Sequence, residues 1–194
     1  MQGQGTAYPQ FFHARLWYNR AMTDQLLSAA QTPHDLDFIS HSPTQTERIG
    51  VRLGHLLCAG DLVLLSGQLG AGKTHLIKGI ARGLGYDGLV TSPTFVLINE
   101  YRADAAHGRL PIYHVDLYRV RDVTELTTIG LDELWLSEGI CLIEWPERAA
   151  AAMPAEHLHI VLSHVSETKR QIRLTPRGMR YRELLLRFKE ETFG

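Results

Sequence analysis

The sequence predicts a single α/β domain, in which a mixed central sheet containing a β-hairpin is flanked by helices. Two short apolar runs, residues 62–65 and 140–143, are typical of strands that are buried on both faces of a sheet. Residues 95–102 and 110–118 alternate between apolar and polar side chains, and a polar link containing glycine separates them, which predicts a long hairpin. Helical spacing of apolar residues before and after these strands completes the α/β pattern.

The first expected element is a helix that begins near Ser42. Ser42 is a good N-cap, Pro43 suits the first helical turn, and Gln45 stands where a capping box needs it. The apolar residues that follow share one helical face, and Gly60 ends the segment. The other expected elements are helices at 73–84, 125–136 and 180–193, and strands at 158–162 and 171–174.

Length and composition indicate one soluble globular domain. The 194 residues are enough for one hydrophobic core and too few for two ordinary domains. Hydrophobic residues make up 44% of the chain and charged residues 21%, and no apolar run approaches the length of a membrane span. Cys58 and Cys141 lie in apolar stretches. We therefore expect a cytoplasmic protein with two buried, reduced thiols and no membrane partner.

Charge is unevenly distributed, although the formal net charge is only −1. Residues 169–194 carry eight Lys or Arg against three Glu. Such a basic C-terminal region could dock on a polyanion or on an acidic protein face, but a solvated amphipathic helix would have the same composition. The charge pattern alone leaves both interpretations open.

The N-terminal segment differs from the rest of the chain. Residues 1–38 show little periodicity and no recognisable motif. We interpret them as an N-terminal extension that could be partly disordered, and residues 39–194 as the folded domain with its basic C-terminal helix. Met22 is an alternative start of the chain, and we assign the extension no function.

Residues 67–74 form the motif that carries the chemistry. Their sequence, GQLGAGKT, fits the pattern G-x-x-x-x-G-K-[ST] of a phosphate-binding loop between a buried strand and a helix. Glycines let the backbone N–H groups converge on phosphate oxygens, and the helix N-terminus adds its positive dipole end. Lys73 is expected to reach the β- and γ-phosphates, and the Thr74 hydroxyl to ligate Mg²⁺. The sequence thus predicts a P-loop NTPase-like domain that binds ATP with Mg²⁺ through Gly67, Leu69, Gly70, Ala71, Gly72, Lys73 and Thr74.

Two carboxylates are candidates to complete this site. Glu144 directly follows the apolar run 140–143, where an acidic partner for Mg²⁺ usually lies in such folds. Asp116 shares one strand face with His114 and Tyr118, and that face could hold a base or a water-positioning group. The same face could equally be the solvated side of a hairpin, which spacing alone favours. Glu144 is therefore the firmer metal candidate.

The chain resembles the TsaE (YjeE) family, the ATPases of bacterial tRNA threonylcarbamoyladenosine synthesis. The P-loop is common to many families, but three further motifs in this order are far more selective: Ser-Pro-Thr-Phe, His-x-Asp-Leu-Tyr-Arg and Ile-Glu-Trp-Pro. The resemblance spans residues 42–174, and it rests on the blocks at 46–50, 69–74, 91–95, 100–101, 114–119, 129–131 and 143–148.

The resemblance implies a function. It implies Mg²⁺-dependent binding and slow hydrolysis of ATP, by the ATPase subunit of a complex that forms threonylcarbamoyladenosine next to the tRNA anticodon. The implied partner is the TsaB–TsaD heterodimer, which carries out the transfer itself. Contact with tRNA would be indirect or would use the basic C-terminal region.

The resemblance also implies roles for individual residues. Lys73 and Thr74 match the phosphate and Mg²⁺ residues, and Glu144 matches the second Mg²⁺ ligand. Thr46 and, more weakly, Glu147 match nucleotide contacts. The catalytic set implied is Asp116, Glu144 and Trp145, and residues 92–94 match a mobile, switch-like loop. Gln68 departs from the family pattern, which usually has Asp there, so hydrolysis could be altered.

Three other classes of function fit a phosphate-binding loop less well. A P-loop small-molecule kinase is the main alternative, but no Arg-rich lid segment is apparent in the sequence. A GTPase is disfavoured because neither Asn-Lys-x-Asp nor Asp-x-x-Gly occurs. A nucleotide-gated binding module overlaps with the first interpretation, since slow hydrolysis makes a nucleotide a timer.

Overall fold

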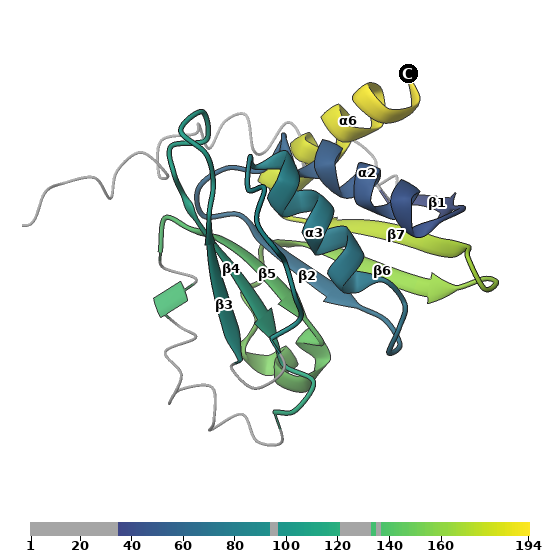
Figure 1. Ribbon diagram of the computed structural model, residues 1–194, viewed down its shortest axis with the longest axis horizontal. Helices are drawn as coiled ribbons and strands as arrows, with labels where there is room; N and C mark the ends of the chain where they lie inside the picture. Colours follow the sequence, from purple (N-terminus) through teal and green to yellow (C-terminus); the bar gives the residue numbers. More distant parts are fainter. Residues whose placement is uncertain (1–34, 94–96, 121–132, 135–136) are drawn as a thin grey trace, which may run out of the picture. The chain divides into compact units, whose positions relative to one another are not determined.

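The computed structural model separates into two compact units, residues Met1–Pro33 and His34–Gly194. The structure describes residues 35–93, 97–120, 133–134 and 137–194, all of which lie in the second unit (Figure 1). The described elements are β1 (Leu36–Ser40), α2 (Pro43–Gly54), β2 (Leu62–Ser66), α3 (Lys73–Gly83), β3 (Ile98–Arg102), β4 (Pro111–Asp116), β5 (Ile140–Glu144), the 3₁₀ helix η1 (Pro146–Ala152), β6 (His157–His164), β7 (Arg170–Arg177) and α6 (Met179–Phe193).

A seven-stranded mixed sheet, in the order β1-β7-β6-β2-β5-β4-β3, organises the described part of this unit. The four central strands β6, β2, β5 and β4 run parallel, and the outer pairs are antiparallel. In register, Leu65 of β2 lies opposite Glu144 of β5, which in turn lies opposite Asp116 of β4. The carboxyl ends of β2, β5 and β4 therefore meet at one edge, which is where open α/β sheets bind ligands.

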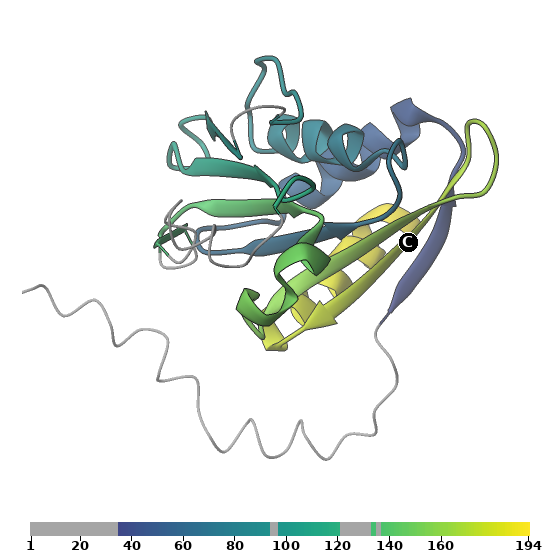
Figure 2. The same ribbon diagram turned by 90° about the horizontal axis from the view of Figure 1, so that it is seen from below.

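The alternation of side chains along β2 divides the core between the two faces of the sheet. Val63 and Leu65 belong to the larger core with the buried residues of α2, α3 and α6, whereas Leu62 and Leu64 belong to a smaller core with residues of β4 and β5. Figures 1 and 2 show α2 and α3 lying side by side on the same side of β2. The helix that begins at the phosphate loop thus packs against both the sheet and α2.

Glycines let α2 and α3 approach each other closely. A Cβ atom added at Gly79 of α3 would lie 2.1 Å from the carbonyl oxygen of Glu47, and one added at Gly83 would lie 2.2 Å from that of Val51. A Cβ atom added at Gly50 or Gly54 of α2 would meet backbone atoms of α3 at comparably short distances. Any side chain larger than hydrogen at these positions would force the two helices apart.

The structure confirms most of the elements expected from the sequence. The buried strands are β2 and β5, and the hairpin is β3–β4, with Tyr101 opposite Ile112. Ser42 caps α2 by accepting a hydrogen bond from Gln45 N at 3.1 Å, and Gln45 accepts one from His41 N at 2.7 Å. The expected apolar face of the C-terminal helix is buried at Tyr181, Leu184, Leu185 and Phe188.

Two findings differ from expectation. Leu36–Ser40 forms edge strand β1 against β7, although these residues overlap the expected extension. Five residues are too few for their alternation to stand out, and the strand is defined by its pairing with β7. Cys58 is exposed, so the expectation of a buried thiol is wrong there, whereas Cys141 is buried on β5. The helix expected at 125–136 falls largely outside the described residues.

No helix in the described part of the chain is long and apolar enough to cross a membrane.

Candidate nucleotide-binding site

The phosphate loop, residues 67–74, joins β2 to α3. Gly67, Gly70 and Gly72 have positive φ angles of 143°, 76° and 100°, which residues with side chains rarely adopt. A Cβ atom at Gly67 would also lie 2.3 Å from the carbonyl oxygen of Leu162 on β6. Gly72 is the N-cap of α3, and no side chain caps this helix start. The first-turn N–H groups of α3 are therefore left for an anion.

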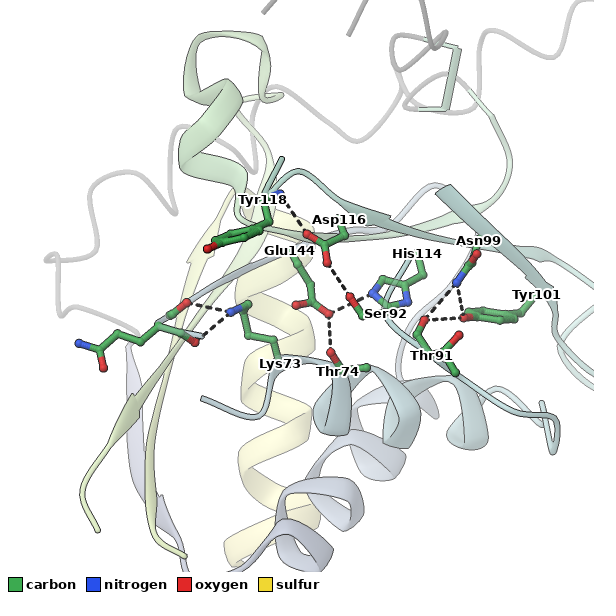
Figure 3. Close-up of polar contacts among 12 residues, drawn as sticks. Lys73, Thr74, Thr91, Ser92, Asn99, Tyr101, His114, Asp116, Tyr118 and Glu144 are labelled. Carbon is green, nitrogen blue, oxygen red and sulfur yellow. Dashed lines mark hydrogen bonds and ion pairs between the residues drawn. The ribbon is translucent and has the colours of Figure 1, made fainter. Parts of the chain in front are cut away.

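Lys73 is buried at the centre of the site, with 4% of its surface exposed. Its Nζ donates hydrogen bonds to the carbonyl oxygens of Gly67 at 2.8 Å and Gln68 at 3.2 Å (Figure 3). The same Nζ lies 3.9 Å from the centroid of the Trp145 ring. Burial lowers the pKa of Lys73, and the negative charges of nearby carboxylates, first that of Glu144, act in the opposite direction. The lysine thus folds back on its own loop.

Glu144, at the end of β5, is held by two donors from different elements. Thr74 Oγ1 on α3 donates to Glu144 Oε1 at 2.9 Å, and His114 Nε2 on β4 lies 3.1 Å from the same oxygen (Figure 3). Glu144 is 4% exposed and His114 is fully buried. His114 therefore does not lie on a solvated side of the hairpin, and that interpretation is wrong for this residue.

Asp116, at the end of β4, fixes the segment that precedes residues 94–96. Ser92 Oγ donates to Asp116 Oδ2 at 2.6 Å, and the backbone N–H of Tyr118 donates to Oδ1 at 3.0 Å (Figure 3). One residue earlier, the Thr91 carbonyl accepts hydrogen bonds from Asn99 Nδ2 at 3.0 Å and the Tyr101 hydroxyl at 3.2 Å. Both anchors tie this loop to the β3–β4 hairpin.

Trp145 follows Glu144 in an unusual backbone conformation. Its φ of 61° and ψ of 46° are left-handed, which costs a residue with a side chain about 1–2 kcal/mol. The Trp145 N–H donates to the Leu65 carbonyl at 3.1 Å, and its ring packs on Tyr118 with a centroid distance of 4.9 Å. The strained turn brings the indole ring over Lys73.

These side chains surround a cavity of about 640 Å³. That volume lies within the range of pockets that take small ligands. Of the residues expected in the site, Leu69, Gly70, Gly72, Lys73, Thr74, Asp116, Glu144 and Trp145 line it. The structure therefore brings together residues that are far apart in the sequence.

Four of the residues expected to contact a nucleotide do not line the cavity. Gly67 and Ala71 shape the loop, and the Ala71 carbonyl accepts a hydrogen bond from Arg170 Nε at 3.2 Å. Thr46 is buried in the first turn of α2, where its hydroxyl lies 2.8 Å from Ser40 Oγ. Glu147 accepts a hydrogen bond from Ser66 Oγ at 3.1 Å. None of these four lines the cavity, so their contact with a nucleotide stays a prediction.

Ser92 and Pro93 also line the cavity, and both belong to the segment 92–94 that the resemblance marked as a switch-like loop. Sequence reasoning did not name four further lining residues as site residues: His75, Leu97, Tyr118 and Arg119. Tyr118 lies on the strand face expected for Asp116, so that alternation was the signal. His75 comes directly after Thr74 in the first turn of α3, so its place at the site could have been inferred from the motif.

Comparison with known proteins places the chain in a family. The model of the family described as "Threonylcarbamoyl adenosine biosynthesis protein TsaE" matches residues 40–172. The chain belongs to the TsaE family. The matched segment runs from the end of β1 into β7 and includes every residue that lines the cavity.

This chain aligns with most of the length of individual TsaE relatives. The tRNA threonylcarbamoyladenosine biosynthesis protein TsaE of Bacillus subtilis is 41% identical over 143 residues, which are 74% of this chain and 87% of the relative. Its counterpart in Treponema pallidum is 41% identical over 134 residues, 69% of this chain and 96% of the relative. The crystal structure of Bacillus subtilis YdiB superposes with a TM-score of 0.71 at 33% identity, covering 84% of this chain and 99% of YdiB.

Proposed function

We propose that the protein binds ATP with Mg²⁺ and hydrolyses it slowly, as the ATPase subunit of the complex that forms threonylcarbamoyladenosine in tRNA. The observation that carries this proposal is the convergence of an uncapped helix start, the buried Lys73 and the Thr74–Glu144 pair on one cavity. The pathway assignment rests on membership of the TsaE family and on the names of the relatives.

The residues present suit the triphosphate. Lys73 Nζ is bonded to carbonyl oxygens of its own loop, so it can turn to phosphate oxygens without breaking an ion pair. Glycines at the positions with positive φ leave the loop backbone open to the anion. The indole of Trp145 stacks against the lysine and shields it from water on one side.

The residues present also suit a magnesium ion. Thr74 Oγ1 gives its hydrogen to Glu144, which leaves the oxygen lone pairs free to face a cation. Thr74 and Glu144 would hold Mg²⁺, since a hydroxyl, a carboxylate and phosphate oxygens are ligands that it prefers. When bound, the ion would neutralise charge that develops on the phosphates.

Asp116 is the candidate to orient the attacking water. It lines the cavity beside Glu144, and its two oxygens are held by Ser92 and the Tyr118 N–H. A carboxylate fixed in this way can accept a hydrogen bond from a water at a defined place. Because Ser92 belongs to the loop anchored there, movement of that loop would change the position of the Asp116 carboxylate.

Intramolecular bonding of three of the eight basic residues in the C-terminal region supports the proposal that contact with tRNA is indirect. Arg180 donates to Asp61 and to the Leu56 carbonyl, and Arg170 donates to four backbone carbonyls, including that of Ala71. Arg173 pairs with Asp37. These arginines brace the fold, so we assign recognition of tRNA to the proposed TsaB–TsaD partner.

A reconstituted reaction tests this proposal. ATP hydrolysis is measured for the wild type and for Lys73→Ala, alone and with TsaB–TsaD from the same organism. We expect slow hydrolysis that depends on Lys73, and threonylcarbamoyl-tRNA that forms over repeated turnovers only when the wild-type protein is present. A hydrolysis rate that TsaB–TsaD does not change would contradict the assignment to this pathway. Transfer of phosphate to a metabolite would do the same and would favour a small-molecule kinase.

A further inference from the structure

We propose that His114 is a positioning residue, which holds the Glu144 carboxylate in the orientation that a metal ion requires. This inference rests on the proposed function of the site. Among the described residues, His114 does not line the cavity, and its hydrogen bond is to Glu144, which does, so its effect would pass through that carboxylate.

The sheet places the imidazole beside the carboxylate. Asp116 of β4 lies opposite Glu144 of β5, and His114 lies two residues earlier on the same side of β4. His114 Nε2 reaches Glu144 Oε1 at 3.1 Å, inside a region from which water is excluded on the imidazole side. The backbone of two adjacent parallel strands thus fixes the distance between the two side chains.

Hydrogen-bond accounting assigns the role of donor to His114. An ionised carboxylate only accepts, so the ring hydrogen must be on Nε2. The other ring nitrogen, Nδ1, is buried and has no hydrogen-bond partner among the described residues. Leaving a buried nitrogen unpaired is unfavourable, and an apolar side chain would fill this part of the core without that penalty. The arrangement is explained if the Nε2 bond to Glu144 is what the site needs.

The two donors to Glu144 belong to different parts of the fold and have different roles. Thr74 is itself a proposed metal ligand and sits on the helix that follows the phosphate loop, so it moves with that loop. His114 sits in the sheet. It is therefore the anchor that keeps the carboxylate in place when Thr74 adjusts to a ligand. Partners that orient a metal ligand from behind typically change metal affinity about 10- to 100-fold when they are removed.

A purely structural role for His114 makes a different prediction. The ring also packs near Tyr101, with a centroid distance of 6.4 Å, so it could serve only to fill the core. His114→Phe keeps a planar ring there but removes the donor. His114→Gln loses the ring but can place an N–H near the position of Nε2. Packing alone would favour Phe, whereas positioning of Glu144 would favour Gln.

The test separates metal binding from nucleotide binding. Mn²⁺ affinity in the presence of ATP is measured by electron paramagnetic resonance, and ATP affinity in EDTA by calorimetry, for the wild type, His114→Phe and His114→Gln. His157→Phe on β6 is the matched control, because His157 does not line the cavity. We expect His114→Phe to weaken Mn²⁺ binding about 10- to 100-fold with ATP affinity in EDTA unchanged. His114→Gln should recover most of the loss, and His157→Phe should match the wild type.

Other outcomes would overturn the inference. A folded His114→Phe with wild-type Mn²⁺ affinity, or a His114→Gln no better than His114→Phe, would leave His114 as a core residue only. If His114→Phe does not fold, His114→Gln is compared with His114→Asn, whose shorter side chain cannot reach Glu144, and equal Mn²⁺ affinities would overturn it. A wild type that binds neither ATP nor Mn²⁺ would overturn the proposed function and this inference together, whereas binding of both ATP and Mn²⁺ that is normal in every variant would overturn this inference alone.

Discussion

Asp116 and Glu144 lie opposite each other on two adjacent parallel strands, so both carboxylates reach the same edge of the sheet. The phosphate loop starts at that edge too, because Leu65 of β2 lies opposite Glu144. The register of three strands thus assembles a lysine, a hydroxyl and two carboxylates from segments that are distant in sequence. Phosphate chemistry needs this combination of cation, metal ligands and a water-orienting group.

Loss of the lysine should weaken nucleotide binding and the stabilisation that accompanies it. Mg²⁺-ATP at a hundred times its Kd should stabilise the wild type by about 2.7 kcal/mol. Lys73→Ala removes a charged donor to phosphate, worth about 1.5–3 kcal/mol, so affinity should fall about 10- to 100-fold. At the same ATP concentration the variant should gain no more than about 1.4 kcal/mol. Denaturation with and without Mg²⁺-ATP measures both, and equal stabilisation of the two proteins would contradict the assigned role of Lys73.

Loss of Glu144, the proposed metal ligand, should separate nucleotide binding from hydrolysis. Glu144→Ala leaves in place the loop backbone and Lys73, which we propose supply much of the phosphate binding. Hydrolysis should fall about 100-fold while ATP affinity changes much less. Calorimetry and a phosphate-release assay report the two quantities. Equal loss of both in a folded variant would argue against a metal role for Glu144.

The contact between α2 and α3 should tolerate no side chain at Gly79. In Gly79→Ala the new Cβ would meet the Glu47 carbonyl oxygen at 2.1 Å, and neither backbone can give way easily. Overpacking of this kind costs about 1–3 kcal/mol, partly offset by the roughly 1 kcal/mol that alanine gains in a helix. Urea denaturation should show a net loss of stability, with Glu183→Ala on the exposed face of α6 as the control. A stabilised Gly79→Ala variant would show that the two helices pack less closely than this contact requires.

The two cysteines should differ in reactivity and in their effect on stability at high pH. Burial raises the pKa of Cys141 from 9.0 to about 12; desolvation also raises the pKa of Cys58, but Cys58 is exposed to reagents. Below about pH 9 the Cys141 thiol is protonated in both the folded and the unfolded state. Between about pH 9 and 12 it ionises only in the unfolded state, because a buried thiolate is unfavourable, so the free energy of unfolding falls as the pH rises. Iodoacetamide should therefore modify Cys58 in the folded protein and Cys141 only after unfolding. The fall in stability above pH 9 should shrink in Cys141→Ala, and rapid labelling of Cys141 in the native protein would contradict its burial.

Local signals in the sequence predicted the centre of the fold and of the site. The apolar runs of β2 and β5, the glycine spacing of the phosphate loop and the carboxylate after β5 each depend on a few adjacent residues. For that reason the sequence alone predicted that Lys73, Thr74 and Glu144 lie together. Strand alternation had made Asp116 a second candidate, and the family motifs supported it and added Trp145; both line the cavity.

Features that depend on distant pairing could not be predicted in the same way. The alternation along β4 cannot say which face is dry, so the burial of His114 follows only from the position of β4 between β3 and β5. β1 is recognisable only through its pairing with β7. The apolar residues around Cys58 suggested burial, but Cys58 lies in the exposed turn before β2.

A crystal structure with Mg²⁺ and a non-hydrolysable ATP analogue tests the central claim most directly. We predict that the phosphates occupy the loop of residues 67–74, and that Lys73 Nζ leaves the carbonyls of Gly67 and Gln68 for phosphate oxygens. We also predict that Mg²⁺ lies between Thr74 and Glu144, with the His114 contact to Glu144 preserved. A nucleotide bound elsewhere, or a Lys73 that still bonds to its own loop beside bound phosphates, would contradict the account.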